Sequence, residues 1–325
     1  MRRLGGILYR FVGPAVFLGL LYFTDLTQVK EIWRKGRPLP IAISALLSIV
    51  VILVKTLRWR RLMSYQGIHY AFAPAARYYA IASALGAWTP GRLGDFSKAV
   101  AVQRDCHVGL GRAASSVIAD RLADAVLLGA VATVGAAFLP GPHALWLAAG
   151  GGVAVLLGSW IVFHKTRSSR AVPAIRRGAE RIVGVADRTI RSLGAKGGEI
   201  GEVIDGLVVL ARPRRGLTFL ATVAAALVVF LQGYLMARSL GLNVGFWTLS
   251  VALSAVSIGS LVPISVAGFG TREAMLALFL VPAGVTMPQI IGFSLAYFVI
   301  ISGTLALIGA AAWVFQPETK VRVTT

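Results

Sequence analysis

The sequence has 325 residues, of which 57% are apolar and only 14% are charged, whereas soluble domains contain about 25% charged residues. Its 33 lysines and arginines exceed its 13 aspartates and glutamates, which leaves a net charge of +20. This hydrophobicity excludes disorder, and long uncharged stretches argue against a soluble enzyme or a nucleic-acid-binding protein. A single cysteine and four scattered histidines predict no disulfide, no metal site and no cofactor. The composition therefore predicts an integral membrane protein.

Six stretches are apolar and long enough, at about 20 residues each, to cross a bilayer as helices. Two further apolar regions are interrupted by proline and glycine beside charged residues, and we expect each to form a broken, re-entrant hairpin. The predicted fold class is an all-α polytopic membrane protein with two such hairpins in an inverted-repeat arrangement, all in a single domain over residues 1–325. In chain order the spans are Leu4–Phe23, Leu39–Leu57, Ala114–Leu139, Ala144–Phe163, Leu217–Leu240 and Gln289–Phe315, and the broken regions are Ala71–Val102 and Phe246–Val285.

The distribution of basic residues predicts the orientation. The polar connector Lys165–Arg215 contains twelve lysines and arginines, and basic loops stay in the cytoplasm. Basic residues near both ends of the chain place both termini on that side of the membrane. The segment Asp25–Arg37 is an exception, because its four basic residues fall on the outer side.

Within this connector, Ser168–Gly194 has apolar residues at helical spacing with arginines between them. This pattern is typical of an amphipathic helix that lies on an anionic leaflet. A second short helix is expected over Ile200–Leu210. The connector is interpreted either as a solvated link held near the membrane or as a segment that gathers anionic lipid.

The two interruptions contain the most informative motifs. The first reads Thr89-Pro-Gly-Arg-Leu-Gly-Asp-Phe-Ser-Lys98, and the second reads Pro263-Ile-Ser-Val-Ala-Gly-Phe-Gly-Thr-Arg-Glu273. Proline removes a backbone donor and glycine permits an open turn, so each helix should stop and restart. Interrupted helices in both halves of a chain are typical of inverted-repeat transporters. The residues expected to break the helices are Pro90, Gly91, Gly94, Pro263, Gly268 and Gly270.

Three cations near the breaks, Arg92, Lys98 and Arg272, are expected to bind phosphate. Helices that restart at Pro90–Gly91 and at Gly270–Thr271 would turn free N–H groups toward an anion, and arginine binds phosphate through two hydrogen bonds. The acids beside these cations, Asp95 and Glu273, would pair with them, or titrate if transport is coupled to protons.

A third charged cluster, Asp120, Arg121 and Asp124, lies inside the predicted span Ala114–Leu139. Charges at this depth are costly, so these three should face the cations of the breaks or a wet cavity, where they would balance charge or gate. The alternative is that all of these charges only hold the hairpins against the bundle. Arg58 and Trp59, at the end of a predicted span, are interpreted as anchors in the membrane interface.

With these motifs in this order, the sequence resembles the flippase-like transmembrane domain of lysylphosphatidylglycerol synthetases, the multiple peptide resistance factor family. The resemblance implies a protein of a bacterial or archaeal inner membrane that moves an anionic or aminoacylated phospholipid, or a polyprenyl-phosphate-linked lipid, between leaflets. Family members usually have glutamate where this chain has Asp95. Because only Gln316–Thr325 follow the last predicted span, we expect a stand-alone form that lacks the aminoacyl-transferase domain.

The predicted function is therefore a lipid translocase without catalytic residues. Two alternatives stay open: a membrane-embedded enzyme that acts on a lipid-linked substrate, and a non-catalytic scaffold that recruits a cytoplasmic partner. The expected partners are membrane lipids and a lipid-modifying enzyme or glycosyltransferase, with a homo-oligomer left open and no nucleic acid. No nucleotide-binding loop is found in the sequence, so movement would be passive or coupled to an ion gradient.

Overall fold

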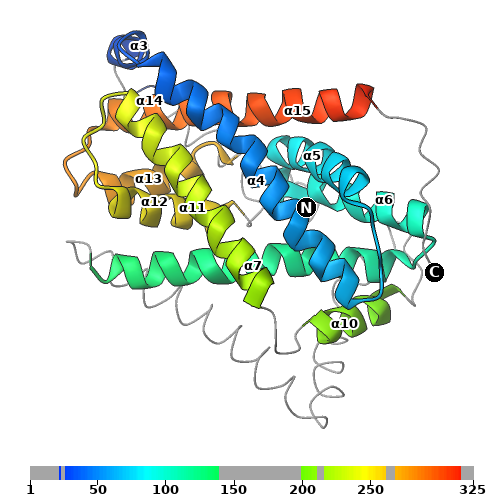
Figure 1. The fold of residues 1–325 in the computed structure, drawn as a ribbon. Coiled ribbons are helices and arrows are strands. Elements are labelled where there is room, and N and C mark those ends of the chain that lie inside the picture. The colour runs from blue at the N-terminus through cyan, green and yellow to red at the C-terminus, as the bar shows by residue number, and fades with distance from the viewer. Residues whose placement is uncertain (1–21, 23–25, 139–198, 211–215, 261–267, 316–325) are drawn as a thin grey trace, which may run out of the picture.

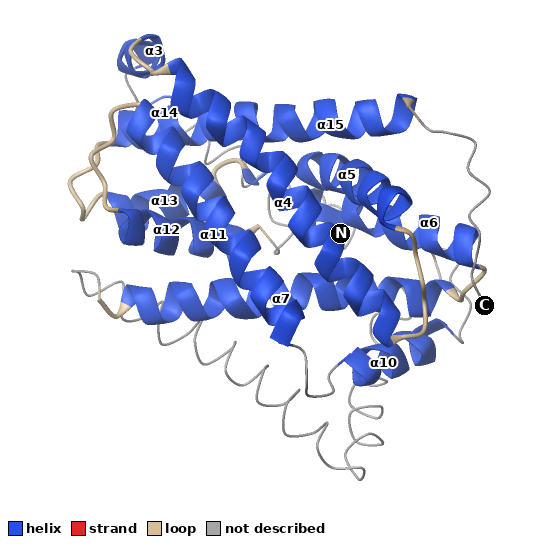
Figure 2. Cartoon of the chain, in the orientation of Figure 1, coloured by secondary structure: helices blue, strands red, loops and turns tan. Residues whose placement is uncertain are grey.

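The computed structural model describes residues 22, 26–138, 199–210, 216–260 and 268–315, and every regular element in these ranges is a helix (Figure 2). The predicted all-α class is confirmed for this part of the chain. Three predicted segments lie wholly or almost wholly outside it, namely Leu4–Phe23, Ala144–Phe163 and Ser168–Gly194.

Among the described residues, three continuous helical segments are long and apolar enough to cross a membrane. They are α4 (Pro38–Tyr65), α11 (Gly216–Ser239) and Met287–Val314. The last consists of α14 (Met287–Tyr297), a π-helical turn (Phe298–Ser302) and α15 (Gly303–Val314). These segments match three predicted spans. A fourth helix, α7 (Leu110–Ala136), covers most of the predicted span Ala114–Leu139 but has four charged residues along its length.

Many large apolar side chains on these helices are exposed, which is expected where a helix faces lipid rather than water. Examples are Leu46 on α4, Leu220 on α11 and Leu307 on α15, which are 63%, 62% and 74% exposed. Helices α4 and α11 pack side by side and cross the other helices obliquely in Figure 1. The described residues therefore form a helical membrane protein with an apolar outer surface.

The remaining elements are shorter helices. The first interrupted region contains α5 (Phe72–Trp88), the 3₁₀ segment η2 (Pro90–Phe96) and α6 (Ser97–Cys106), and the second contains α12 (Phe246–Gly259) and α13 (Thr271–Leu280). Outside them are α3 (Leu26–Arg34) and α10 (Glu199–Leu210), which confirms the short helix expected near Ile200–Leu210. Helix α10 packs against α7 (Figure 1).

Two apolar cores divide the described residues, and each contains one interrupted region. One core joins α4, α5, α6 and α7 around Trp59, Tyr79 and Val102. The other joins α11 to α14 around Leu249, Leu280 and Phe293. The arms of each interrupted region pack against one another, α5 against η2 and α6, and α12 against α13. The membrane side from which each region enters, and the inverted-repeat relationship, stay predictions.

The first break differs from the expectation in where its helix restarts. Helix α5 ends before Thr89, Gly91 and Arg92 both take left-handed backbone conformations with φ of 58° and 53°, and the next α-helix begins only at Ser97. Two consecutive left-handed residues cannot begin a right-handed helix, so the expected N-terminus at Pro90–Gly91 is wrong. Arg92 therefore lies in a turn rather than in the first turn of an α-helix.

The second break agrees better with the expectation. Gly268 and Gly270 have φ of 76° and 81°, and α13 begins at Thr271 with Gly270 as its N-cap. Arg272 and Glu273 therefore lie in the first turn of this helix, as expected. Pro263 lies outside the described residues.

Candidate functional site

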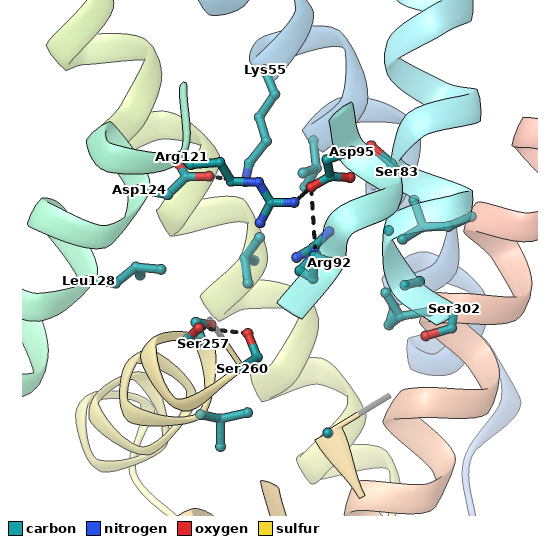
Figure 3. Close-up of a pocket in the computed structure, with 18 of the residues that line it drawn as sticks. Lys55, Ser83, Arg92, Asp95, Arg121, Asp124, Leu128, Ser257, Ser260 and Ser302 are labelled. Atoms are coloured by element: carbon teal, nitrogen blue, oxygen red, sulfur yellow. Dashed lines mark hydrogen bonds and ion pairs between the residues drawn. The ribbon is translucent and has the colours of Figure 1, made fainter. Parts of the chain in front are cut away.

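A cavity of about 290 Å³ lies between the two interrupted regions. Its wall includes Arg92 from η2 and Arg272 from α13, together with residues of α4, α5, α7, α11 and α12 and of the π-helical turn. Lys55, Arg92, Asp95, Arg121 and Asp124 gather on one side of it, whereas Ser257, Ser260 and Ser302 line other parts of the wall (Figure 3). The cavity thus brings together charges from segments far apart in the sequence.

Asp120 on α7 is the centre of a buried network of ion pairs. Its carboxylate, with only 2% of the residue exposed, accepts hydrogen bonds from Arg58 Nε at 2.9 Å, Lys98 Nζ at 2.8 Å and the Tyr79 hydroxyl at 2.9 Å. One turn further along α7, Asp124 pairs with Lys55 at 2.7 Å and with Arg58. Two carboxylates are therefore shared by three cations.

The expectation that Asp120 faces a cation of the first break is met by Lys98. However, Lys98 does not line the cavity. Its ammonium group is buried, binds Asp120 and lies 3.9 Å from the centre of the Tyr79 ring and 5.0 Å from that of Trp59. In this arrangement Lys98 holds α6 against α7.

Arg58 and Trp59 are not interface anchors. Arg58 is 1% exposed and Trp59 is fully buried, with its indole N–H donating to Ser116 at 3.0 Å. The sequence also offered a signal that Lys55 and Arg58 belong to the site. They are three residues apart within or next to an apolar span, so they share one helix face, as Asp120 and Asp124 do.

Asp95 lies where η2 meets α5. Its carboxylate pairs with Arg121 of α7 and lies 3.8 Å from Arg92 Nε. Gly86 makes room for it, because a Cβ at Gly86 would overlap the carboxylate, and a Cβ at Gly94 would overlap the backbone of α5. The pair between Arg121 and Asp95 therefore joins α7 to the first break (Figure 3).

The Glu273 side chain caps the N-terminus of α13. It is fully buried, accepts the Gly270 N–H at 2.7 Å, pairs with Arg272 at 2.8 Å and accepts a hydrogen bond from Ser294 of α14. The Arg272 guanidinium lies 5.2 Å and 5.0 Å from the ring centres of Phe269 and Phe298. This first turn is therefore capped by the protein's own carboxylate, and its arginine has a neutralising partner.

Positive charge exceeds negative charge around the cavity. The wall contains three carboxylates and the four cations Lys55, Arg92, Arg121 and Arg272. The buried partners Arg58, Lys98 and Glu273 add one further positive charge. Among the described residues, no group of histidine, cysteine and acidic side chains could hold a metal ion. A cavity with this composition favours an anion.

Helical segments that can span a membrane, around a charged cavity, define a polytopic membrane protein with an internal polar site. Residues 10–309 match the family model described as the lysylphosphatidylglycerol synthase TM region. The chain therefore belongs to this family of membrane proteins of lipid metabolism, as its motifs indicated. No curated protein matches the sequence.

Proposed function

We propose that this chain is a lipid translocase of the cytoplasmic membrane. It moves a lipid with an anionic phosphate headgroup between leaflets, either a phospholipid or a polyprenyl-phosphate-linked lipid. The observation that carries the proposal is the cavity between the two interrupted regions, whose wall contains four cations and three carboxylates. Charged side chains are retained inside an apolar bundle at a cost, and those beside a cavity mark a pathway for a polar group.

The headgroup would enter the cavity while the acyl or prenyl tails stay in the bilayer. Large exposed side chains lie near the first break, including Trp88 and Leu93, which are 53% and 63% exposed. These groups, like the outward faces of α4 and α11, suit contact with lipid tails. The carboxylates keep the cations fixed and charged in the absence of lipid, which lowers the cost of organising the site when an anion arrives.

The π-helical turn Phe298–Ser302 supports a pathway at this position. It forms part of the cavity wall through Phe298, Ile301 and Ser302. A single turn of π-helix inside an α-helix is rare and occurs mostly at functional sites. The π-helical turn also places the Phe298 ring against the Arg272 guanidinium. This contact connects the π-helical turn in the cavity wall with the cation of the second break.

A liposome assay tests the proposal directly. Purified protein is reconstituted with fluorescent phosphatidylglycerol, phosphatidic acid or polyprenyl phosphate, and the fraction accessible to an external quencher is followed over time. Wild-type protein should expose inner-leaflet label, and Arg92→Gln or Arg272→Gln should slow this by about tenfold or more, since charged hydrogen bonds contribute ~1.5–3 kcal/mol each. Arg238→Gln is the matched control, because Arg238 lies at the end of α11, outside the cavity wall, and bonds the exposed Asn243.

The proposal fails if every labelled lipid stays in its starting leaflet. Mass spectrometry of the recovered lipids separates transport from chemistry, because an enzyme acting on a lipid-linked substrate would change their masses. If the protein is a scaffold, wild-type protein should move no labelled lipid between leaflets in the liposome assay. Its function in cells should also survive the Arg92→Gln substitution.

A further inference from the structure

The two breaks differ in how well their positive charge is neutralised. At the second break, Arg272 donates to Glu273 and to Ser294, and one cation meets one carboxylate. At the first break, Arg92 and Arg121 share the single carboxylate of Asp95. The ratio of cations to carboxylates therefore differs between the breaks, and only at the first break would a bound anion neutralise an excess positive charge.

The network on α7 adds to this imbalance from the same side. Asp120 and Asp124 are shared by three cations, of which Lys55 lies on the cavity wall. Together with the Asp95 group, five cations meet three carboxylates, so two positive charges have no counter-charge within the part of the chain that the structure describes. In Figure 3, Lys55, Arg92 and Arg121 converge on one side of the cavity, next to Asp95 and Asp124.

Arg92 is the cation best placed to meet a ligand. Its side chain is 38% exposed, and its Nε lies 3.8 Å from the carboxylate that it shares. This Nε is buried and has no hydrogen-bond partner among the described residues. A buried donor without an acceptor is costly, and an anion in the cavity would supply one. The left-handed backbone at Arg92 is likewise uncommon for a residue other than glycine, and such residues cluster at ligand sites.

An excess of two charges selects between kinds of phosphate. A phosphate diester carries one negative charge, whereas a phosphate monoester carries about −1.5 to −2 at neutral pH and has three terminal oxygens that accept hydrogen bonds. A cationic aminoacyl headgroup would add positive charge, although every carboxylate of the wall already has a cationic partner. The remaining wall is largely apolar and includes Leu128 and Val229, which suits a ligand with a tail.

We infer that the first break, through Arg92 with Arg121 and Lys55, is a binding site for a dianionic phosphate monoester on a lipid tail, in preference to phosphate diesters and aminoacylated lipids. The inference rests on the proposed lipid translocase and narrows its substrate class. It also assigns unequal roles to the two arginines: Arg92 sets the preference for a dianion, whereas Arg272, which Glu273 neutralises, supports passage of the headgroup without setting that preference.

Binding to the purified full-length protein tests this inference without requiring transport. Short-chain phosphatidic acid is compared with phosphatidylmethanol, which differs only by a methyl group that removes one charge, and with phosphatidylglycerol. Phosphatidic acid should bind about tenfold or more tightly than either diester, because charged hydrogen bonds are the strong ones. Arg92→Gln should abolish this preference, whereas Arg272→Gln and the control Arg238→Gln should keep it.

Equal affinities for phosphatidic acid and phosphatidylmethanol in the wild type would overturn the inference, as would an unchanged preference in a folded Arg92→Gln protein. Inorganic phosphate that displaces phosphatidic acid at equal concentration would show a site for free phosphate and would also overturn it. The liposome assay keeps the two proposals apart. A monoester that binds but is never moved refutes the translocase alone, and equal transport of diesters with no binding preference refutes only the narrowed class.

Discussion

Removing the Asp120 carboxylate should strongly destabilise the protein. The Asp120→Asn substitution keeps the side-chain shape but removes the charge that meets Arg58 and Lys98, which are 1% and 2% exposed. Lys98 would then have lost its carboxylate partner, and Arg58 and Lys55 would share Asp124 alone. Breaking a buried ion pair by removing one partner costs about 3–5 kcal/mol because the other charge stays buried without compensation.

The lower end of that range is the better expectation, since the asparagine oxygen can still accept one of the hydrogen bonds that Arg58 and Tyr79 donate. At roughly 2 °C per kcal/mol for a chain of this size, the midpoint of thermal unfolding should fall by about 6 °C. The assay is thermal unfolding of purified protein in detergent. Unfolding is measured as the loss of the monodisperse peak in size-exclusion chromatography after heating to each temperature.

Two variants make the experiment decisive. Glu31→Gln is the control, because Glu31 pairs with Lys35 at an exposed site and such pairs contribute little. Adding Lys98→Met to Asp120→Asn removes one of the uncompensated cations, so the double variant should be more stable than the sum of the single effects, with a coupling of about 0.5–3 kcal/mol. An unchanged midpoint for Asp120→Asn, or strict additivity in the double variant, would refute the network.

Three further predictions concern the breaks and the native thiol. Gly86→Ala should lower lipid transport and cost about 1–3 kcal/mol of stability, because the new Cβ would displace the Asp95 carboxylate. Gly303→Ala is the control, because a Cβ at Gly303 would meet no atom of the described residues within 4 Å. Equal behaviour of the two variants would contradict the close approach of Gly86 and Asp95. Glu273→Ala removes both the cap on Gly270 and the carboxylate partner of Arg272, so its free energy of unfolding should fall by more than the ~1 kcal/mol of a cap alone. The free energy of unfolding of a Glu273→Gln variant should fall less. The pKa of the Cys106 thiol, at the end of α6, is raised mainly by burial and also by the charge of Asp105. Its alkylation by iodoacetamide at pH 7.5 should therefore be slower than that of the unfolded chain and should accelerate as the pH rises, whereas equal rates would show an exposed thiol.

The features that sequence analysis predicted best depend on local chemistry. Pro90 and Gly91 follow the end of α5, and Gly270 precedes α13, because proline lacks a backbone donor and glycine permits left-handed turns wherever they stand. Helices α4 and α11 are recognisable by length and hydrophobicity alone. The charges of α7 could be predicted to have partners, since an isolated charge at that depth is too costly. Which partners they have was predictable only in part, because Asp120 and Arg58 are 62 residues apart.

Arg58 shows why the rest could not be predicted. An arginine beside a tryptophan at the end of an apolar stretch is typical of the membrane interface. The spacing of Lys55 and Arg58 within α4 indicates a charged face, but it does not distinguish a buried face from an exposed one. The difference comes from α7, whose two carboxylates approach this face of α4 in the folded chain. A pattern within one helix therefore indicates which face is charged, whereas the packing of two helices decides whether that face is buried.

The breaks illustrate the same limit at shorter range. Both motifs combine glycine, arginine and an acid, and the sequence treats them as equivalent. In the second, Glu273 is three residues from Gly270 and the backbone is helical, so the acid folds back to cap its own helix and neutralise Arg272. In the first, two left-handed residues interrupt the helix, and Asp95 is drawn to Arg121 of another helix, which leaves Arg92 only a distant share of it. The unequal charge of the two breaks, and with it the narrowed substrate class, follows from that difference in backbone rather than from residue composition.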